Sequence, residues 1–302
     1  MPLDIQNYRG RFAPSPTGPL HFGSLIAAVA SYCQARSQKG TWLVRMEDVD
    51  ELRNVAGAAD TILRTLEAFG FEWDESVIYQ TQRKDTYEYY LQQLFENNLI
   101  YRCTCSRRDL REHATSGNLG LIYPGTCDNK HYSAKIEAAL RIRTQDRTIQ
   151  FNDQIMGDYG HNLKQDLGDF IVKRRDGLFA YQLAVVIDDE FQQITDIVRG
   201  VDLLDSTPRQ IYLQQSLNFH TPGYAHLPIA VNTLGDKLSK QTGAHGINKR
   251  HAVSELVKAM NFLGQTTEPG LENASLNTFW QWSMENWQLA RIPDTEKITY
   301  IE

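Results

Sequence analysis

The sequence predicts an α/β fold built on a parallel sheet with helical crossovers. Strand-like and helix-like patterns alternate through the first hundred residues, which is typical of such a sheet. The same alternation returns after about residue 180. Between these two stretches, cysteines and the turn segments "SGNLG" and "YPG" interrupt the pattern, which indicates an insertion in the α/β unit.

The first hundred residues are expected to contain both kinds of element. Two short apolar stretches are typical of buried strands, and the second of them ends in charge. Three longer segments place apolar side chains three or four residues apart, as the buried face of a helix requires. We expect strands at residues 8–13 and 41–48 and helices at residues 22–38, 54–70 and 84–97.

The remainder of the chain is expected to complete the sheet and then to become helical. From about residue 247 onward, apolar and aromatic residues up to Trp287 recur at helical spacing, which favours a packed core over a base-stacking surface. We expect short strands at residues 140–143, 169–173, 193–200 and 227–232 and a helix at residues 207–219.

Composition and charge are those of an ordinary globular chain. The 302 residues are 41% hydrophobic and 23% charged, and the formal net charge is −6. No N-terminal stretch is typical of a signal peptide, and no stretch approaches the ~18 apolar residues that a membrane span needs. We therefore expect a cytoplasmic monomer without a membrane partner. The arginine-rich runs at 107–111 and 173–175 are interpreted as solvated surface charge.

The stretch "RFAPSPTGPLHFGS", residues 11–24, lies where the first strand gives way to the first helix. Backbone N–H groups at such a position favour anions, so a phosphate site is expected there. The three prolines would stiffen the turn, and Gly18 and Gly23 lack the Cβ that would block a ligand. His21 would donate a hydrogen bond to a phosphate oxygen. The alternative is a rigid helix start without a ligand, because the stretch matches neither Walker A nor GxGxxG.

A second candidate phosphate segment is "GDKLSKQ", residues 235–241. Lys237 and Lys240 are three residues apart on a predicted loop after a strand. Lysine is a mobile point charge suited to phosphate, so the pair would grip a triphosphate. By itself the segment is more typical of a solvated loop, because lysine-rich loops are usually just solvated.

Together the two segments resemble the HIGH and KMSKS signatures of class I aminoacyl-tRNA synthetases. The surrounding segments "RMEDVD", "YQLAVVIDD", "DIVRGVDLLDSTPRQ" and "HLPI" are similar, in this order, to the glutamyl-tRNA synthetase catalytic domain. The resemblance covers about residues 8–245. Ser24 stands in place of the second histidine of HIGH, and "KLSKQ" in place of KMSKS, variants that are familiar among glutamyl enzymes.

The C-terminal part departs further from that family. A glutamyl-tRNA synthetase continues into a substantial anticodon-binding region, whereas this sequence ends at Glu302 after a short helical segment. In this respect it resembles the glutamyl-queuosine tRNA(Asp) synthetases, free-standing paralogues of the catalytic domain. The resemblance implies a Rossmann-like parallel sheet, an inserted zinc-bearing α+β subdomain and a short C-terminal helical domain. The expected boundaries are 1–100 with 180–245, 101–179 and 246–302, respectively.

Three of the four cysteines lie close together in the insertion: Cys103, Cys105 and Cys127. Three thiolates indicate structural Zn²⁺, which takes four ligands in a tetrahedron. From the residues alone, His113 or His131 is the expected fourth ligand, since imidazole is a commoner ligand than phenolate. The resemblance instead implies Tyr123, in a Cys-x-Cys…Tyr-x-x-x-Cys pattern, with one zinc per chain. Reduced cysteines without a metal are the alternative.

The resemblance also implies an amino-acid pocket. Glutamate carries one ammonium and two carboxylates, so its pocket needs an acid and cationic or hydroxyl donors. Glu47 would take the ammonium, while Arg11 and Arg199 would clamp the carboxylates, in an order that the sequence does not specify. The full implied set is Arg11, Phe12, Ala13, Pro14, Ser15, Glu47, Tyr181 and Arg199.

Four other charged residues near these segments are left outside the pocket. Arg45 lies beside Glu47 on a predicted strand, and its side chain is expected on the opposite face. Asp188, Asp189 and Arg209 would be structural or would contact acceptor RNA.

The reaction implied by the resemblance is ATP-dependent ligation. His21 would stabilise the α-phosphate, and Lys240 with Mg²⁺ would offset charge on the leaving phosphates. Glutamyl-adenylate would form without tRNA, and its glutamyl group would pass to queuosine in tRNA(Asp). The alternatives are an enzyme that charges the 3′ end of a tRNA with glutamate or glutamine, and an inactive RNA-binding paralogue. The implied ATP-binding residues are His21, Gly23, Ser24, Lys237 and Lys240.

Overall fold

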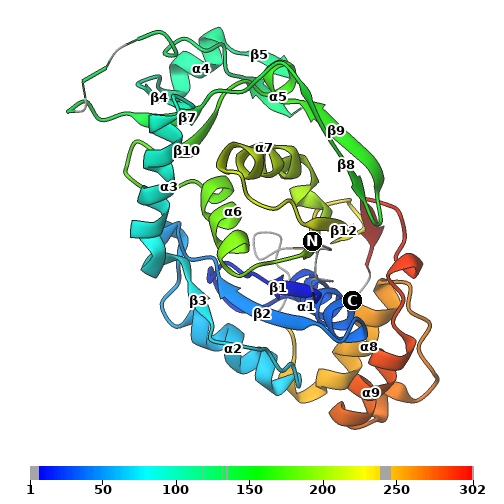
Figure 1. Ribbon diagram of the computed structural model, residues 1–302. Helices are drawn as coiled ribbons and strands as arrows, with labels where there is room; N and C mark the ends of the chain where they lie inside the picture. The colour runs from blue at the N-terminus through cyan, green and yellow to red at the C-terminus, as the bar shows by residue number, and fades with distance from the viewer. Residues whose placement is uncertain (1–6, 118, 131, 134, 239–245, 301–302) are drawn as a thin grey trace, which may run out of the picture.

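Two groups of parallel strands meet at the centre of the structure (Figure 1). In the first group, β1 (Arg9–Phe12) pairs with β2 (Thr41–Met46), and β2 pairs with β3 (Ile78–Tyr79). In the second, β11 (Asp196–Gly200) pairs with β12 (Gly223–Leu227). This computed structural model describes residues 7–117, 119–130, 132–133, 135–238 and 246–300.

The two groups are joined side by side through β1 and β11. The Thr195 N–H, just before β11, donates to the Arg9 carbonyl at 3.0 Å, and the Arg9 N–H donates to Thr195 Oγ1 at 2.9 Å. The spatial order is therefore β3-β2-β1-β11-β12. The strands that follow β1 in the sequence, β2 and β3, lie on one side of it, and the later strands β11 and β12 lie on the other, so the strand order reverses between β1 and β11. In open parallel sheets, ligands bind at the carboxyl ends of the strands at such a switch point.

Helices cover both faces of this sheet (Figure 1). Along β2, Trp42, Val44 and Met46 belong to the apolar core that contains α1. Leu43, between them, belongs to the core that contains α3, α6 and α7. This alternation is the period of two expected for a strand buried on both faces. The helices are α1 (Phe22–Ser37), α2 (Ala58–Ala68), α3 (Lys84–Glu96), α6 (Tyr181–Phe191) and α7 (Thr207–Leu217).

The stretch between α3 and α6 forms smaller antiparallel sheets, drawn at the top of Figure 1. Its hairpin β8–β9 extends down to the central sheet, where Asp153 of β8 pairs with Tyr224 of β12. Its two other sheets have the orders β10-β7-β4 and β5-β6. The elements are β4 (Ile100–Cys103), α4 (Arg107–His113), β5 (Thr115–Gly117), β6 (Gly120–Ile122), β7 (Ala139–Ile142), β8 (Thr148–Asp153), β9 (Gly157–Asn162), α5 (Leu163–Asp166) and β10 (Phe170–Lys173).

The C-terminal part is helical and packs on α1. Trp280 lies against Tyr32 and Phe71, and its indole N–H donates to the Phe69 carbonyl at 3.0 Å. A last strand pairs in parallel with the strand after β12. These elements are β13 (Ile229–Val231), α8 (Ala252–Phe262), α9 (Leu276–Asn286) and β14 (Lys297–Thr299). Short 3₁₀ turns are η1 (Glu51–Arg53), η2 (Gln80–Arg83), η3 (Val201–Ser206), η5 (Lys249–His251), η6 (Leu271–Asn273) and η7 (Leu289–Arg291).

The predicted fold class is confirmed: an α/β protein with a parallel sheet and a helical C-terminal part. Among the strands, the sequence did not predict β3, β4, β5, β6, the β8–β9 hairpin, β14 or most of β12. The strand expected at 227–232 is divided between β12 and β13, with Pro228 between them, because proline has no N–H for a continuous ladder.

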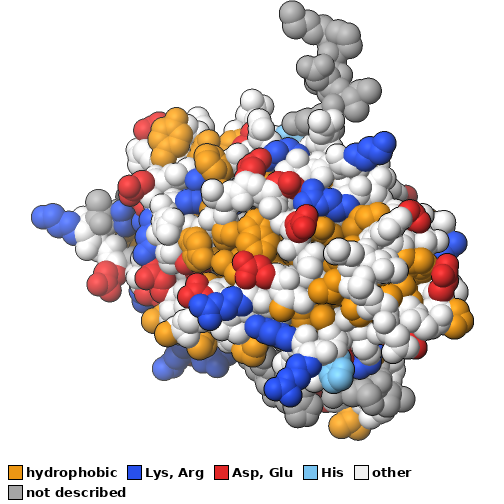
Figure 2. Space-filling model, turned by 90° about the horizontal axis from the view of Figure 1, so that it is seen from below, with side chains coloured by type: hydrophobic (Ala, Val, Ile, Leu, Met, Phe, Trp, Pro, Cys, Tyr) orange, Lys and Arg blue, Asp and Glu red, His pale blue; other side chains and the backbone are white. Residues whose placement is uncertain are grey.

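The surface seen from below mixes both signs of charge with apolar side chains (Figure 2). On the described part of this face, several Lys and Arg side chains lie toward the lower edge of the view, and acidic side chains are spread over the rest. None of the helices in the described part of the chain is both long and apolar enough to cross a membrane.

Two glycines after α8 provide a test of this C-terminal packing. Both have positive φ, but a Cβ on Gly264 would lie 2.3 Å from the Arg291 carbonyl oxygen, whereas a Cβ on Gly270 would meet nothing within 4 Å. Gly264→Ala should therefore lower the free energy of unfolding by about 2 kcal/mol more than Gly270→Ala, since only the first adds overpacking to backbone strain. Urea denaturation measures both, and equal losses would contradict the packing described.

Candidate active site

A cleft of ≈ 760 Å³ opens at the switch point, beside the carboxyl ends of β1 and β11. The structure brings together in this cleft every described residue of the two predicted ligand sets. Lys240, with its neighbours Ser239 and Gln241, lies outside the described residues. The predicted residues that line the cleft are Arg11, Phe12, Ala13, Pro14, Ser15, His21, Gly23, Ser24, Glu47, Tyr181, Arg199 and Lys237.

The turn after β1 is held against the segment after β2. The Pro14 carbonyl accepts the Glu47 N–H at 3.0 Å, and the Pro16 carbonyl accepts the Val55 N–H at 3.0 Å. Proline carbonyls remain good acceptors although the residue lacks a donor. The turn thereby brings Glu47 and the start of α1 to the same cleft.

His21 is the N-cap of α1. Its Nδ1 accepts the Ser24 N–H at 3.3 Å, so a neutral His21 ring carries its proton on Nε2, as a phosphate-facing donor requires. A Cβ on Gly23 would lie 3.2 Å from His21 Cε1 and 3.7 Å from the Leu238 carbonyl. A side chain at this position would therefore press on the His21 ring as well as on any ligand.

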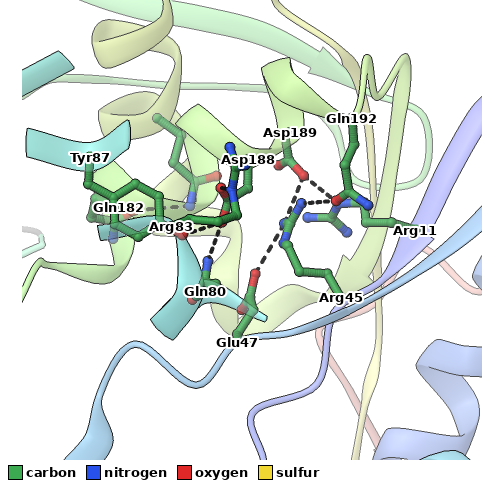
Figure 3. A network of polar contacts seen from close by, with 11 residues as sticks. Arg11, Arg45, Glu47, Gln80, Arg83, Tyr87, Gln182, Asp188, Asp189 and Gln192 are labelled. Atoms are coloured by element: carbon green, nitrogen blue, oxygen red, sulfur yellow. Dashed lines mark hydrogen bonds and ion pairs between the residues drawn. The ribbon is translucent and has the colours of Figure 1, made fainter. Parts of the chain in front are cut away.

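A buried ionic network forms one wall of the cleft (Figure 3). Asp189 Oδ1, on α6, accepts from Arg11 Nε at 3.0 Å and from Arg45 Nη2 at 2.8 Å. Arg45 Nη2 also lies 3.2 Å from Glu47 Oε1, and its Nη1 donates to Gln192 Oε1 at 2.7 Å. Each of these arginines thus joins a strand of the sheet to α6.

The expectation for Arg45 was wrong. Residues two apart along a strand share a face, and β2 places Arg45 toward α6, on the same side as Glu47. The alternation of apolar Leu43 with Trp42 and Val44 contained this information.

The acidic pair at the end of α6 has a structural role. Asp188 accepts from Gln80 Nε2 at 2.9 Å, from Arg83 Nε at 2.6 Å and from the Tyr87 hydroxyl at 2.7 Å. It therefore ties α6 to η2 and α3, while Asp189 binds Arg11 and Arg45 (Figure 3). Arg209, on α7, is not among the cleft residues.

The electrostatics of the cleft follow from this burial. Burial acts to raise the pKa of Asp189, but Arg11 and Arg45 outweigh it, and the pKa is lowered. Burial raises the pKa of Glu47, with Arg45 and Arg11 acting in the opposite direction. Burial, together with the charge of Glu47, raises the pKa of Tyr181 to about 12, so the phenol is neutral at pH 7. A cation beside Glu47 would further favour its ionised form.

The remaining predicted cations are held by side chains that the sequence analysis did not identify. Arg199 donates from Nε to His226 Nε2 at 3.0 Å and from Nη2 to Thr207 Oγ1 at 2.8 Å. Lys237 Nζ lies 2.7 Å from Asp202 Oδ2. The only signals in the sequence for these partners were the acid in "RGVD", Asp202, and the histidine in "AHLPI", His226.

A separate cluster of thiols lies in the inserted stretch. The Sγ atoms of Cys103, Cys105 and Cys127 lie within 4.8 Å of one another. Among the described residues, no other set of three or more His, Cys, Asp or Glu side chains is placed to hold a metal ion. The Tyr123 hydroxyl lies 3.3 Å from Cys103 Sγ and 3.7 Å from Cys105 Sγ. His113 is not part of the cluster, and His131 lies outside the described residues.

These atoms fit a tetrahedral zinc site. Zn–S bonds of ~2.3 Å place two sulfur ligands about 3.8 Å apart, and Cys105 Sγ and Cys127 Sγ are separated by 3.5 Å. The Cys127 N–H donates to the Tyr123 hydroxyl oxygen at 3.1 Å, a contact that would stabilise a phenolate. Burial raises the pKa of Tyr123, so a cation is needed for this oxygen to ionise near neutral pH.

Comparison with known proteins agrees with this geometry. Residues 7–273 match the family described as class I tRNA synthetases (E and Q), catalytic domain. The crystal structure of the glutamate-tRNA synthetase from Elizabethkingia anophelis superposes with a TM-score of 0.82 over 98% of this chain and 68% of that one, at 23% sequence identity. The fold is thus that of a class I tRNA synthetase catalytic domain.

Closer relatives define the branch. The glutamyl-Q tRNA(Asp) synthetase of Dechloromonas aromatica is 52% identical over 95% of this chain and 96% of its own length. The protein of the same name from Chromobacterium violaceum is 49% identical over 95% of each chain. This chain belongs to the glutamyl-Q tRNA(Asp) synthetase family.

The buried pair Asp153–His226 behind Arg199 predicts a pH-dependent stability. Burial, with the charge of Arg199, lowers the pKa of His226 from 6.5 to about 4, although Asp153 acts to raise it. Between these pKa values the unfolded chain binds a proton at His226 that the folded chain does not. The free energy of unfolding should therefore fall by about 2 kcal/mol from about pH 7.5 to about pH 5 on account of this residue.

The variant His226→Gln, which cannot titrate, isolates this contribution. Urea denaturation of both proteins at the two pH values measures it, because the other histidines titrate alike in both. Equal pH dependence of the two proteins would show that folded His226 is not held neutral.

Proposed function

We propose that this chain activates L-glutamate with ATP in the absence of tRNA and transfers the glutamyl group to the queuosine base of tRNA(Asp). The observation that carries the proposal is the cleft at the carboxyl ends of β1 and β11, which gathers Glu47, Arg11, Arg199 and the start of α1. The name of the relatives, glutamyl-Q tRNA(Asp) synthetase, supports the identity of the acceptor.

The charges of the cleft match those of glutamate. Glu47 would bind the ammonium, and that contact would offset the burial that raises the pKa of Glu47. Arg11 and Arg199 would bind the two carboxylates, and both are already fixed by protein partners. Fixed donors lose little conformational entropy on binding. Tyr181, neutral at pH 7, would contribute a hydroxyl donor.

ATP would occupy the part of the cleft beside α1. The N-terminus of a 16-residue helix favours phosphate, and Ser24 and Gly23 lie in its first turn. His21, protonated on Nε2, would donate to the α-phosphate. Lys237, and Lys240 beyond the described residues, would offset the charge of the leaving phosphates. Mg²⁺ bound with ATP would supply further charge neutralisation on the phosphates.

The proposed chemistry has two steps. A carboxylate oxygen at Cα of glutamate attacks the α-phosphorus of ATP, the bond to the bridging oxygen breaks, and pyrophosphate leaves. A hydroxyl of the cyclopentenediol ring of queuosine then attacks the activated carbonyl carbon, losing its proton, and AMP leaves. Neither step needs a covalent protein intermediate, so positioning and fixed charges carry the catalysis.

Charging of the 3′ end of a tRNA is the second candidate, because the superposed glutamate-tRNA synthetase has the same fold. That likeness rests on 23% identity, whereas the glutamyl-Q tRNA(Asp) synthetases reach 52%. An inactive RNA-binding paralogue is disfavoured by the cleft, which is lined by all the described residues that are predicted to bind phosphate or glutamate.

Pyrophosphate exchange tests the first step. The purified protein with ATP, labelled pyrophosphate and glutamate, but no tRNA, should exchange label into ATP. Glu47→Gln should raise the KM for glutamate about tenfold or more, since it removes a buried charge-assisted contact, and should change the KM for ATP little. Glu67→Gln, on the exposed face of α2, is the matched control.

The second step separates the candidates. Labelled glutamate should be transferred to queuosine-containing tRNA(Asp) and should leave that tRNA with a free 3′ end. Transfer to the 3′ end of tRNA(Glu) would establish the second candidate instead, and a protein that neither exchanges nor transfers would be the inactive paralogue.

We further propose that Cys103, Cys105, Cys127 and Tyr123 hold one structural Zn²⁺. Four protein ligands would close the coordination shell, so the ion would stabilise the inserted stretch and take no part in catalysis. The three thiols come from β4, the segment after it and the turn after β6, segments that share only a small apolar cluster of their own.

Elemental analysis tests the metal site. The protein should contain about one zinc per chain, and the double variant Cys103→Ser with Cys105→Ser should contain none. Tyr123→Phe, which keeps three thiolates, should lose zinc to a chelator faster than the parent protein. Cys33→Ala, within α1, is the matched control and should keep its zinc. A parent protein that is purified without zinc from zinc-supplied cells would contradict the site.

A further inference from the structure

The guanidinium of Arg199 is held by protein on two of its three nitrogens. Nε donates to His226 Nε2 at 3.0 Å, and Nη2 donates to Thr207 Oγ1 at 2.8 Å. Nη1 is buried and has no hydrogen-bond partner among the described residues, although the side chain as a whole lines the cleft. Because a buried donor without an acceptor is unfavourable, Nη1 is the nitrogen that a bound carboxylate would satisfy.

The protonation of His226 follows from its partners. Arginine has only donors, so His226 Nε2 must accept from Arg199, and the ring proton must lie on Nδ1. Nδ1 lies 2.6 Å from Asp153 Oδ2, and both side chains are fully buried. The lowered pKa values of His226 and Asp153 agree with a neutral imidazole beside a carboxylate. The contact therefore orients the ring as a hydrogen-bond acceptor toward Arg199.

Asp153 is fixed in turn by the backbone of the β8–β9 turn. Its Oδ1 accepts the N–H groups of Ile155 at 3.0 Å and Met156 at 2.9 Å, and also that of His226 at 3.1 Å. The Gln154 N–H donates to the Tyr224 carbonyl at 2.9 Å. The chain Asp153–His226–Arg199 thus runs from the tip of the inserted hairpin, across β12, to the cleft.

We propose that His226, oriented by Asp153, is a positioning residue that directs Arg199 Nη1 to a carboxylate of bound glutamate. The proposal rests on the proposed function, because it concerns the same cleft. It also gives the β8–β9 hairpin a role in glutamate affinity. His226 touches neither substrate, so its removal should act on the KM for glutamate through Arg199.

Two near-isosteric variants distinguish the contribution of His226 Nδ1 from that of Nε2. In His226→Asn the amide reaches the place of Nδ1 and can still donate to Asp153, but nothing accepts from Arg199 Nε. In His226→Gln the amide oxygen reaches the place of Nε2 and accepts from Arg199, while the contact with Asp153 is lost. His220→Asn, at an exposed histidine, is the matched control.

Pyrophosphate exchange at varied concentrations of glutamate and of ATP measures the KM of each variant for the two substrates. His226→Asn should raise the KM for glutamate about tenfold, the size expected for one charged hydrogen bond, with little change in the KM for ATP. His226→Gln should rescue most of this loss, and His220→Asn should resemble the parent protein. In the background of Arg199→Lys, which lacks Nε, His226→Asn should raise the KM no further, as expected for residues that act as a unit.

Each alternative outcome is decisive. An unchanged KM for glutamate in folded His226→Asn, equal losses in the Asn and Gln variants, or additive losses in the double variant would overturn the positioning role while the proposed function stands. A parent protein that does not exchange with glutamate would overturn the proposed function, and the positioning role with it.

Discussion

One carboxylate shared by two buried arginines is the contact on which the candidate site depends. Asp189 binds Arg11 of β1 and Arg45 of β2, and all three side chains are almost completely buried. Burying such charges is costly unless each is paired and hydrogen-bonded. Without Asp189 the two guanidinium groups would repel each other in a low-dielectric interior. The sheet and α6 are thereby held at the spacing that forms one wall of the cleft.

Arg199, on the other side of the switch point, is fixed by a different means. Its partners are neutral side chains, His226 and Thr207, so its charge is not cancelled at close range. Arg11, by contrast, shares Asp189 with Arg45. The two arginines of the proposed glutamate site thus differ in the charge available to a ligand. Donors fixed before the ligand arrives need no reorganisation during the reaction, which is how electrostatic catalysis operates.

The inserted stretch contributes to the fold at two separate places. Its thiol cluster gathers β4 and the turn after β6 around a small core that is distinct from the main cores. Its hairpin β8–β9 instead extends the central sheet by pairing with β12 and delivers Asp153 behind the cleft (Figure 1). A segment that interrupts the α/β pattern in sequence is therefore continuous with it through hydrogen bonds.

The sequence by itself determined β1, β2 and β11 and the helices around them, because hydrophobic period is a local property. Its resemblance to the glutamyl-tRNA synthetases implied the ligand residues that the structure places in the cleft. It placed α1 and α7 closely and gathered three cysteines within 25 residues of chain. Only the tertiary structure decided the partners of these residues. Asp189 lies 178 residues from Arg11, and His226 lies 27 residues from Arg199. Asp153, which contacts His226, lies 46 residues before Arg199. Such pairings arise from packing across the sheet. Periodicity in the sequence predicts that a side chain is buried, whereas only the tertiary structure determines which partner a buried charged side chain contacts.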